Sequence, residues 1–246
     1  MDKMLYVSMT GAHNNSLAQS AHANNLANIS TNGFRRDFEQ ARSMQVFGDT
    51  LPARVYAMTE RPGTDFTPGT LQETGRDLDV AIGGRGWLAV QAADGSEAYV
   101  RTASLNIDAL GMLRTGNGLP VMGNGGPIAV PPEQKVEIGQ DGTISIRALG
   151  EGPSVLAEVD RLKLVNPDLK QMEKGSDGLI RFKGAEPVQA DASVQVTSGF
   201  LESSNVNAVE EMTAILSLSR QFELQVKMMR TAEDNAAAVA RVLQIS

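Results

Sequence analysis

Proline and glycine are distributed so unevenly along this chain that they divide it into three parts. Residues 1–28 contain no proline and a single glycine, Gly11, and residues 206–246 contain neither. All ten prolines and nearly all of the 24 glycines lie between these ends. Because proline and glycine interrupt helices and mark turns, this distribution predicts a helix at each end and a β-rich middle, which is an α+β fold.

The C-terminal part has the clearest helical periodicity. Its apolar residues recur in alternating steps of three and four, the spacing of a coiled-coil seam. The expected seam residues are Met212, Ile215, Phe222, Val226, Met229, Ala236, Ala240 and Leu243, with Ser219 and Glu233 interrupting the pattern. We predict a C-terminal helix over 206–246, with Asn205 as its N-cap.

The N-terminal part shows the same spacing with fewer apolar residues. Its expected seam contains Leu5, Met9, Ala12, Ser16, Gln19, Ala23 and Leu26. A seam this polar does not hold an isolated helix together, so we predict that residues 1–33 pair with the C-terminal helix in a coiled-coil-like terminal domain. Asn28 to Gly33 is the expected helix end, because asparagine and glycine tolerate the left-handed conformation. Periodicity alone leaves open whether the heptads pack within one chain or between chains.

The middle of the chain divides further by its turn residues. Residues 34–76 are polar with three prolines, which predicts an extended connector that has room for a short hairpin. From 77 to 196, short apolar runs alternate with turns such as Asp94-Gly95, Asp141-Gly142 and Asp177-Gly178. This pattern predicts a central all-β domain, a small sandwich or barrel. Residues 197–205 are expected to form a return connector to the C-terminal helix.

Composition excludes several classes of function. The formal net charge is −7 and the one basic pair, Arg35-Arg36, is followed by Asp37, so we expect no nucleic-acid partner. The chain has no cysteine, which excludes disulfides and thiolate sites. No run approaches the roughly 20 apolar residues of a membrane span, and the first fifteen residues lack the apolar core of a secretory signal. We therefore expect no membrane insertion.

No arrangement in the sequence points to catalysis, a metal or a cofactor. His13 and His22 are the only histidines, and they have no clustered carboxylates around them. The glycine-rich segments 83–86 and 123–126 lack the lysine of a phosphate-binding loop. We expect the chain not to be an enzyme. A cell-wall hydrolase and a coiled-coil adaptor are the competing hypotheses, and the first would need an acid/base pair that the scattered carboxylates do not provide.

One segment carries a specific family signature. Residues 23–35 read A-N-N-L-A-N-I-S-T-N-G-F-R, and they closely resemble the N-terminal signature of the flagellar rod and hook proteins. Its positions here are Asn24, Asn25, Leu26, Ala27, Asn28, Thr31, Gly33 and Phe34. Two further stretches resemble the same family: residues 77–87, with Tyr99 and Arg101, and residues 198–223. The resemblance therefore extends over the whole chain.

The resemblance implies a structural subunit of the flagellar basal body with a helical terminal domain and an outer β domain. It implies polymerisation into a helical tube that transmits motor torque to the hook and filament. The implied partners are copies of the chain, other axial proteins of the proximal and distal rod, and the flagellar type III export apparatus. Export would need no cleaved signal peptide, and the subunit would lie in the periplasmic rod.

Within the family, the length, the opening Met1-Asp2, Trp87 and the segment Gly125-Gly126-Pro127-Ile128 are most similar to proximal rod subunits. Distal rod and hook subunits are the alternative. We also predict that the terminal stretches 1–33 and 206–246 are mobile in the free subunit and become ordered on assembly, because unassembled ends have little to bury against.

Overall fold

The computed structural model describes residues 4–45, 55–148, 156–184 and 187–245, and it divides into two compact units. The first, here called the helical unit, contains Met1–Ile29, Arg36–Asp65 and Val206–Ser246. The second, the β unit, contains Ser30–Arg35 and Phe66–Asn205. The expected α+β class, with a helix at each end and a β-rich centre, is confirmed.

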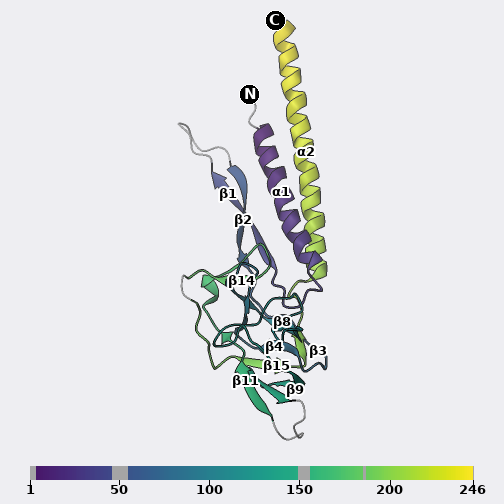
Figure 1. Cartoon of the computed structure of the whole chain (residues 1–246). Coiled ribbons are helices and arrows are strands. Elements are labelled where there is room, and N and C mark those ends of the chain that lie inside the picture. Colours follow the sequence, from purple (N-terminus) through teal and green to yellow (C-terminus); the bar gives the residue numbers. More distant parts are fainter. Residues whose placement is uncertain (1–3, 46–54, 149–155, 185–186, 246) are drawn as a thin grey trace. The chain divides into compact units, whose positions relative to one another are not determined.

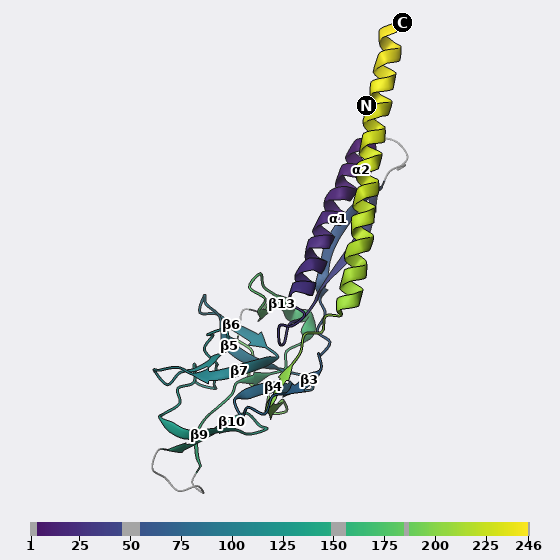
Figure 2. The same cartoon turned by 90° about the vertical axis from the view of Figure 1, so that its right-hand side faces the viewer.

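Two antiparallel helices make up most of the helical unit. Helix α1 spans Met4–Ala27 and helix α2 spans Ala208–Ile245. They lie side by side, with the start of α2 beside the end of α1 (Figures 1 and 2). At 1.5 Å per residue, α1 is about 36 Å long and α2 about 57 Å. The final part of α2 therefore extends beyond the first turn of α1.

A β-hairpin completes the helical unit. Strands β1 (Asp37–Gln45) and β2 (Val55–Thr64) pair antiparallel, and both contact α1. The sequence led us to expect an extended connector over 34–76. The structure instead pairs most of 37–64 in one hairpin and assigns 66–76 to the β unit. Strand pairing satisfies backbone groups without requiring apolar side chains, so a polar stretch can form such a hairpin.

The buried face of α1 lies one residue away from the expected seam. Its fully buried positions are Ser8, Gly11, Ala12, Ala18 and Asn25. Of the expected seam, Ala12 is buried and Leu26 is half-buried, but Leu5 and Met9 are 42% and 53% exposed. Small residues occupy this buried face because they let the helix approach its neighbours closely. At Gly11, an added Cβ would lie 3.0 Å from the Gln225 side chain.

Helix α2 keeps its expected seam only in part. Ile215, Val226 and Met229 are half-buried, whereas Met212 and Phe222 are exposed. The buried residues are Glu211 and Ala232. Every described side chain from 233 to 241 is exposed, including Ala236 and Ala240, and the side chain of Leu243 lies outside the described residues. The seam beyond residue 232 therefore has no cover from α1 within the described part of the chain.

The N-cap of α2 differs from the sequence prediction. The Asn207 side chain accepts hydrogen bonds from Val209 N at 3.0 Å and Glu210 N at 3.4 Å. Asn205 instead donates its side-chain amide to the Thr67 carbonyl at 3.1 Å, within the β unit. Both asparagines suit a cap, so the sequence alone could not choose between them.

The β unit consists of short antiparallel strands in four sheets. Their orders are β12-β5-β6-β14-β13, β15-β4-β7-β8, β11-β10-β9 and β16-β3. The strands are β3 (Leu71–Glu73), β4 (Asp79–Gly83), β5 (Trp87–Gln91), β6 (Glu97–Val100), β7 (Thr102–Ile107), β8 (Leu113–Thr115), β9 (Glu133–Ile138), β10 (Thr143–Ala148), β11 (Ala157–Arg161), β12 (Leu164–Val165), β13 (Met172–Lys174), β14 (Ile180–Phe182), β15 (Gln195–Ser198) and β16 (Phe200–Glu202). One 3-10 turn, Leu169–Gln171, precedes β13.

Branched aliphatic side chains fill the main core of the β unit. The fully buried members include Val80, Leu88, Leu105, Leu113, Val121, Ile128, Ile144 and Leu162. They come from three of the sheets and from the turns between them, so the core joins strands that are distant in sequence. The late strands β15 and β16 pair with the early strands β4 and β3. The β unit therefore needs residues from both ends of its sequence.

No helix within the described residues is long and apolar enough to cross a bilayer.

The tight face of α1 generates a stability prediction at Ser8. Its side chain is fully buried, and its hydroxyl has no hydrogen-bond partner among the described residues. Ser8→Leu should overpack this face and destabilise the helical unit by about 1–3 kcal/mol. Ser8→Ala should not destabilise it, because it removes an unpaired buried hydroxyl. Thermal melting followed by circular dichroism at the helical band measures both changes.

The matched control is Ser20→Leu, the same substitution at an exposed position of α1. It should leave the melting temperature of the helices nearly unchanged. Equal melting of Ser8→Leu and Ser20→Leu would show that this face of α1 is not packed in the free subunit.

Candidate assembly site

Asn25 fastens the end of α1 to the hairpin. Its side chain is 1% exposed and makes two hydrogen bonds to the backbone of Asp37. The amide nitrogen donates to the Asp37 carbonyl, and the amide oxygen accepts from the Asp37 N–H, both at 3.0 Å. This two-way contact imitates strand pairing, which only an amide side chain can do. It gives one asparagine of the signature a specific structural role.

Polar side-chain contacts link the start of α2 to the rest of the helical unit. His22 Nδ1 lies 2.5 Å from the buried Glu211 carboxylate. Arg36 pairs with Asp65 at 3.0 Å and with Glu210 at 3.1 Å. Burial opposes the charge on Arg36, but hydrogen bonds and charges of Glu210 and Asp65 raise the pKa of its guanidinium above the ordinary value. Both glutamates lie in the first turn of α2, where negative charge is favourable.

The second half of the signature belongs to the β unit. Gly33 has a φ of +71° and donates its N–H to the Glu202 carbonyl at 2.7 Å. A Cβ there would lie 2.9 Å from the Thr102 methyl group, so both conformation and space require glycine. Phe34 lies beneath the Lys174 ammonium, which is 3.8 Å from the ring centre. The exposed Thr31 accepts the Phe34 N–H at 3.2 Å.

The other signature residues lie at the last turn of α1. Asn28 donates its backbone N–H and its side-chain amide to the Asn24 carbonyl, at 3.2 Å and 2.9 Å. The Asn24 side chain and Ala27 are exposed, and Leu26 is half-buried. The structure therefore divides the signature: 24–28 end the helix in the helical unit, and 31–34 are held in the β unit.

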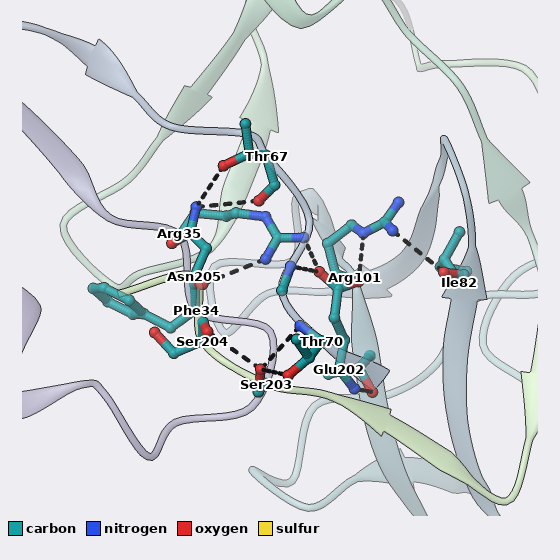
Figure 3. A network of polar contacts seen from close by, with 12 residues as sticks. Phe34, Arg35, Thr67, Thr70, Ile82, Arg101, Glu202, Ser203, Ser204 and Asn205 are labelled. Atoms are coloured by element: carbon teal, nitrogen blue, oxygen red, sulfur yellow. Dashed lines mark hydrogen bonds and ion pairs between the residues drawn. The ribbon is translucent and has the colours of Figure 1, made fainter. Parts of the chain in front are cut away.

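A buried carboxylate between two guanidinium groups forms the centre of the β unit's polar network. Glu202 and Arg35 are each 1% exposed, and Arg101 is 5% exposed. One carboxylate oxygen of Glu202 accepts from Arg35 and from Gly69 N, and the other accepts from Arg101 Nε at 2.9 Å. Figure 3 shows both guanidinium groups pointing toward this carboxylate. The network thus joins segments separated by 101 and 167 residues.

Arg101 also organises the glycine-rich turn after β4. Its guanidinium donates to the carbonyls of Gly86, Gly84 and Ile82 at 2.5, 2.7 and 3.2 Å. The Trp87 ring lies close to both cations. The guanidinium carbons (Cζ) of Arg101 and Arg35 are 5.6 and 5.9 Å from the ring centre. Such cation–π contacts stabilise a desolvated guanidinium. Residues 83–86 are therefore a turn that binds an arginine of its own chain, which agrees with rejecting a phosphate loop.

Apolar side chains are exposed mainly on the helical unit. Among the described residues, fifteen of the nineteen large exposed apolar side chains belong to it. We call those on the two helices the apolar outer face: Leu5, Tyr6, Met9, Leu17, Val209, Met212, Leu216, Phe222, Leu224, Met228 and Val239. Where such side chains form a contiguous patch, the patch marks a protein contact. Four of the seam residues predicted from sequence, Leu5, Met9, Met212 and Phe222, belong to this outer face, whereas Ala12, Leu26, Ile215, Val226 and Met229 are buried or half-buried.

Sequence reasoning missed the roles of Arg35, Arg101 and Glu202. Each lies in a stretch that carries the family resemblance, but nothing in the sequence pairs residues so far apart. A charged residue in an otherwise apolar strand, as in Phe200-Leu201-Glu202, was the available signal. The described residues contain no group of three potential metal ligands. What the arrangement offers chemically is a rigid polar core and an apolar surface for binding protein.

The network generates a prediction at Glu202. Glu202→Gln removes the carboxylate charge that lies between two buried guanidinium groups, which should destabilise the β unit by about 3–5 kcal/mol. Trp87 is the only tryptophan of the chain and lies against the network, so its fluorescence in urea measures the loss directly. Glu173→Gln is the control, because Glu173 is exposed and pairs only loosely with Lys183 at 3.5 Å. Equal losses in the two variants would contradict a central role for Glu202.

Comparison with known proteins matches three parts of the chain to family patterns. Residues 5–35 match "Flagella basal body rod protein". Residues 81–146 match "Flagellar hook protein FlgE/F/G D1 domain", and residues 197–242 match "Flagellar basal body rod FlgEFG protein C-terminal". The first and last of these segments carry the helices and the network residues Arg35 and Glu202.

Full-length relatives agree with these matches. The flagellar basal-body rod protein FlgF of Escherichia coli K12 is 42% identical over 252 aligned residues, covering 100% of both chains. FlgF of Salmonella typhimurium is 40% identical, also over 100% of both. The rod protein FlgG of Buchnera aphidicola from Schizaphis graminum is 31% identical over 93% of this chain and 95% of its own. The chain therefore belongs to the FlgF group of flagellar basal-body rod proteins, a family of structural proteins and not of enzymes.

Proposed function

We propose that this chain is a structural subunit of the proximal rod, polymerising into a helical tube that transmits motor torque to the hook and filament. The observation that carries the proposal is the apolar outer face of α1 and α2. A free subunit leaves these side chains in water, and burying them against neighbours would stabilise assembly by roughly 25 cal/mol per Å². Contacts that join the outer face of one subunit to a different surface of the next build a helix when the rotation between subunits does not close into a ring.

The expected partners follow from the same surface. Copies of the chain and other axial proteins of the proximal and distal rod would cover the outer face and the exposed end of α2. In this proposal the terminal helices pack as a coiled coil, and the β-rich region, expected over 77–196 as a small sandwich or barrel, lies on the outside of the tube. Delivery would use the flagellar type III export apparatus, without a cleaved signal peptide, to the periplasmic rod. The proposal includes no cofactor, nucleic acid or membrane insertion.

A distal rod or hook subunit is the alternative within the family. The FlgF relatives reach 42% and 40% identity over the full chain, against 31% for the FlgG relative. This difference supports the proximal assignment. The two alternatives use the same outer face, so they differ in neighbours and not in the physical mechanism of assembly.

The outer face generates a test of assembly. Leu216 is 60% exposed in α2, so Leu216→Glu should fold normally in the free subunit yet block burial against a neighbour, because a buried unpaired carboxylate is costly. In a strain without the native gene, we expect Leu216→Glu to fail to restore motility. Electron microscopy should show basal bodies with membrane rings but incomplete rods.

Leu110→Glu is the matched control, since Leu110 is highly exposed but lies in a turn of the β unit. It should restore motility. Trp87 fluorescence and circular dichroism of both purified variants report whether folding is intact. Normal rods with Leu216→Glu would exclude this face from assembly.

The exposed helices also predict how the free subunit is digested. We expect limited proteolysis to remove segments from 1–33 and 206–246 before it cuts the β unit, beginning in α2 beyond residue 232, where the described side chains are all exposed. Mass spectrometry of the fragments over time measures the order. Terminal helices that survive as long as the β unit would contradict assembly-dependent ordering.

A further inference from the structure

Methionine is concentrated in the helical unit. Eight of the eleven methionines lie in its segments, although the β unit contains more residues. Three of them, Met9, Met212 and Met228, are exposed on the apolar outer face, at 53%, 53% and 41%. In the β unit, Met172 is buried and Met112 and Met122 are half-buried. The chain has no cysteine, so methionine provides all of its sulfur.

Each exposed sulfur has apolar neighbours on its helix. Met9 lies four residues from Leu5 and three from Tyr6, and Met212 lies between Val209 and Leu216. Residues three and four apart lie on one side of a helix, so these methionines are embedded in the surface that assembly would bury. A flexible thioether suits a surface that must fit several different neighbours. The same exposure leaves the sulfur open to oxidants before the subunit is assembled.

We propose that Met9, Met212 and Met228 are oxidation sites through which peroxide controls the assembly of this subunit. The thioether sulfur attacks hydrogen peroxide, an S–O bond forms as the O–O bond breaks, and water leaves. The sulfur is thereby oxidised by two electrons to the sulfoxide. The sulfoxide is polar, and burying it without a hydrogen-bond partner costs free energy, which opposes binding of the subunit to its neighbours. Reduction by a thiol-dependent sulfoxide reductase would restore the thioether, so the block is reversible.

The effect on assembly rests on the proposed function, whereas the order of oxidation does not. The first experiment treats the purified full chain with a limiting amount of hydrogen peroxide and follows each methionine by peptide mass spectrometry. A gain of one oxygen is expected at Met9, Met212 and Met228 well before Met172. Oxidation of Met172 at the same rate as these three would overturn the assignment, whatever the chain assembles with.

The second experiment measures assembly in cells without the native gene. The native chain is compared with a triple variant, Met9→Leu, Met212→Leu and Met228→Leu, and with a control, Met112→Leu, Met122→Leu and Met172→Leu. Each strain receives a sublethal peroxide pulse while the subunit is induced. The fraction of complete rods is then compared with the same strain untreated, so that any effect of leucine itself cancels.

For the native chain and the control, the fraction of complete rods should fall at least about fivefold after peroxide, because a polar sulfoxide opposes burial. The helical triple variant should lose far less. An equal loss in all three strains would overturn peroxide control through these residues. Complete rods in a strain lacking the chain altogether would instead refute the proposed function, and the order of oxidation would still stand on its own test.

Discussion

The Glu202 carboxylate, buried between Arg35 and Arg101, is the interaction on which the β unit depends. Removing three charged groups from water is costly, and only their mutual attraction with additional hydrogen bonds offsets that cost. The additional bonds are present: Gly69 N and the carbonyls of Gly86, Gly84 and Ile82 complete the network. The network therefore favours one specific arrangement of the chain. The charges are tolerated only when all three segments are in place.

This requirement ties the two signature segments of the β unit together. Gly33 donates to the Glu202 backbone while Arg35 binds the Glu202 side chain, so the residues before the hairpin and those before α2 share one anchor. Trp87, at the start of β5, contacts both cations through its ring. The three family matches each contribute to this anchor or to the sheet beside it. Their shared presence in one chain thus has a physical reason.

The helical unit follows a different principle. Its inner face is built from small and polar residues, Ser8, Gly11, Ala12 and Ala18, which allow close packing but bury little apolar area. Several of its larger apolar residues, such as Leu5, Met9 and Leu216, are exposed, whereas Ile215, Val226 and Met229 are half-buried. In an isolated protein this arrangement would give little hydrophobic stabilisation, since burial of large apolar side chains contributes most to the free energy of folding. In a subunit that adds neighbours, it leaves that stabilisation for the contacts between chains.

The periodic pattern located both helices, but only some of the seam residues it selects are buried within the chain. A heptad pattern identifies the side of a helix with the most apolar residues. In α1 that side contains Leu5 and Met9, which are exposed. The buried face lies one residue away because α2 and the hairpin cover the small residues. The hairpin itself was underestimated, since its polar strands lack alternation. The Asn207 cap had no local signal that distinguished it from Asn205, and the charge of Glu202 in an apolar strand did not say which residues it would pair with.

The sequence by itself determined the helical ends, the β-rich centre, the turns at Asp94-Gly95 and Asp141-Gly142, and the family signature. These are local properties, set by residues that are close neighbours in the chain. Only the tertiary structure decided which side of each helix is buried, which strands pair across the β unit, and which carboxylate neutralises Arg35 and Arg101. Those choices join residues up to 167 positions apart, and they depend on how well distant surfaces fit, which no local pattern encodes.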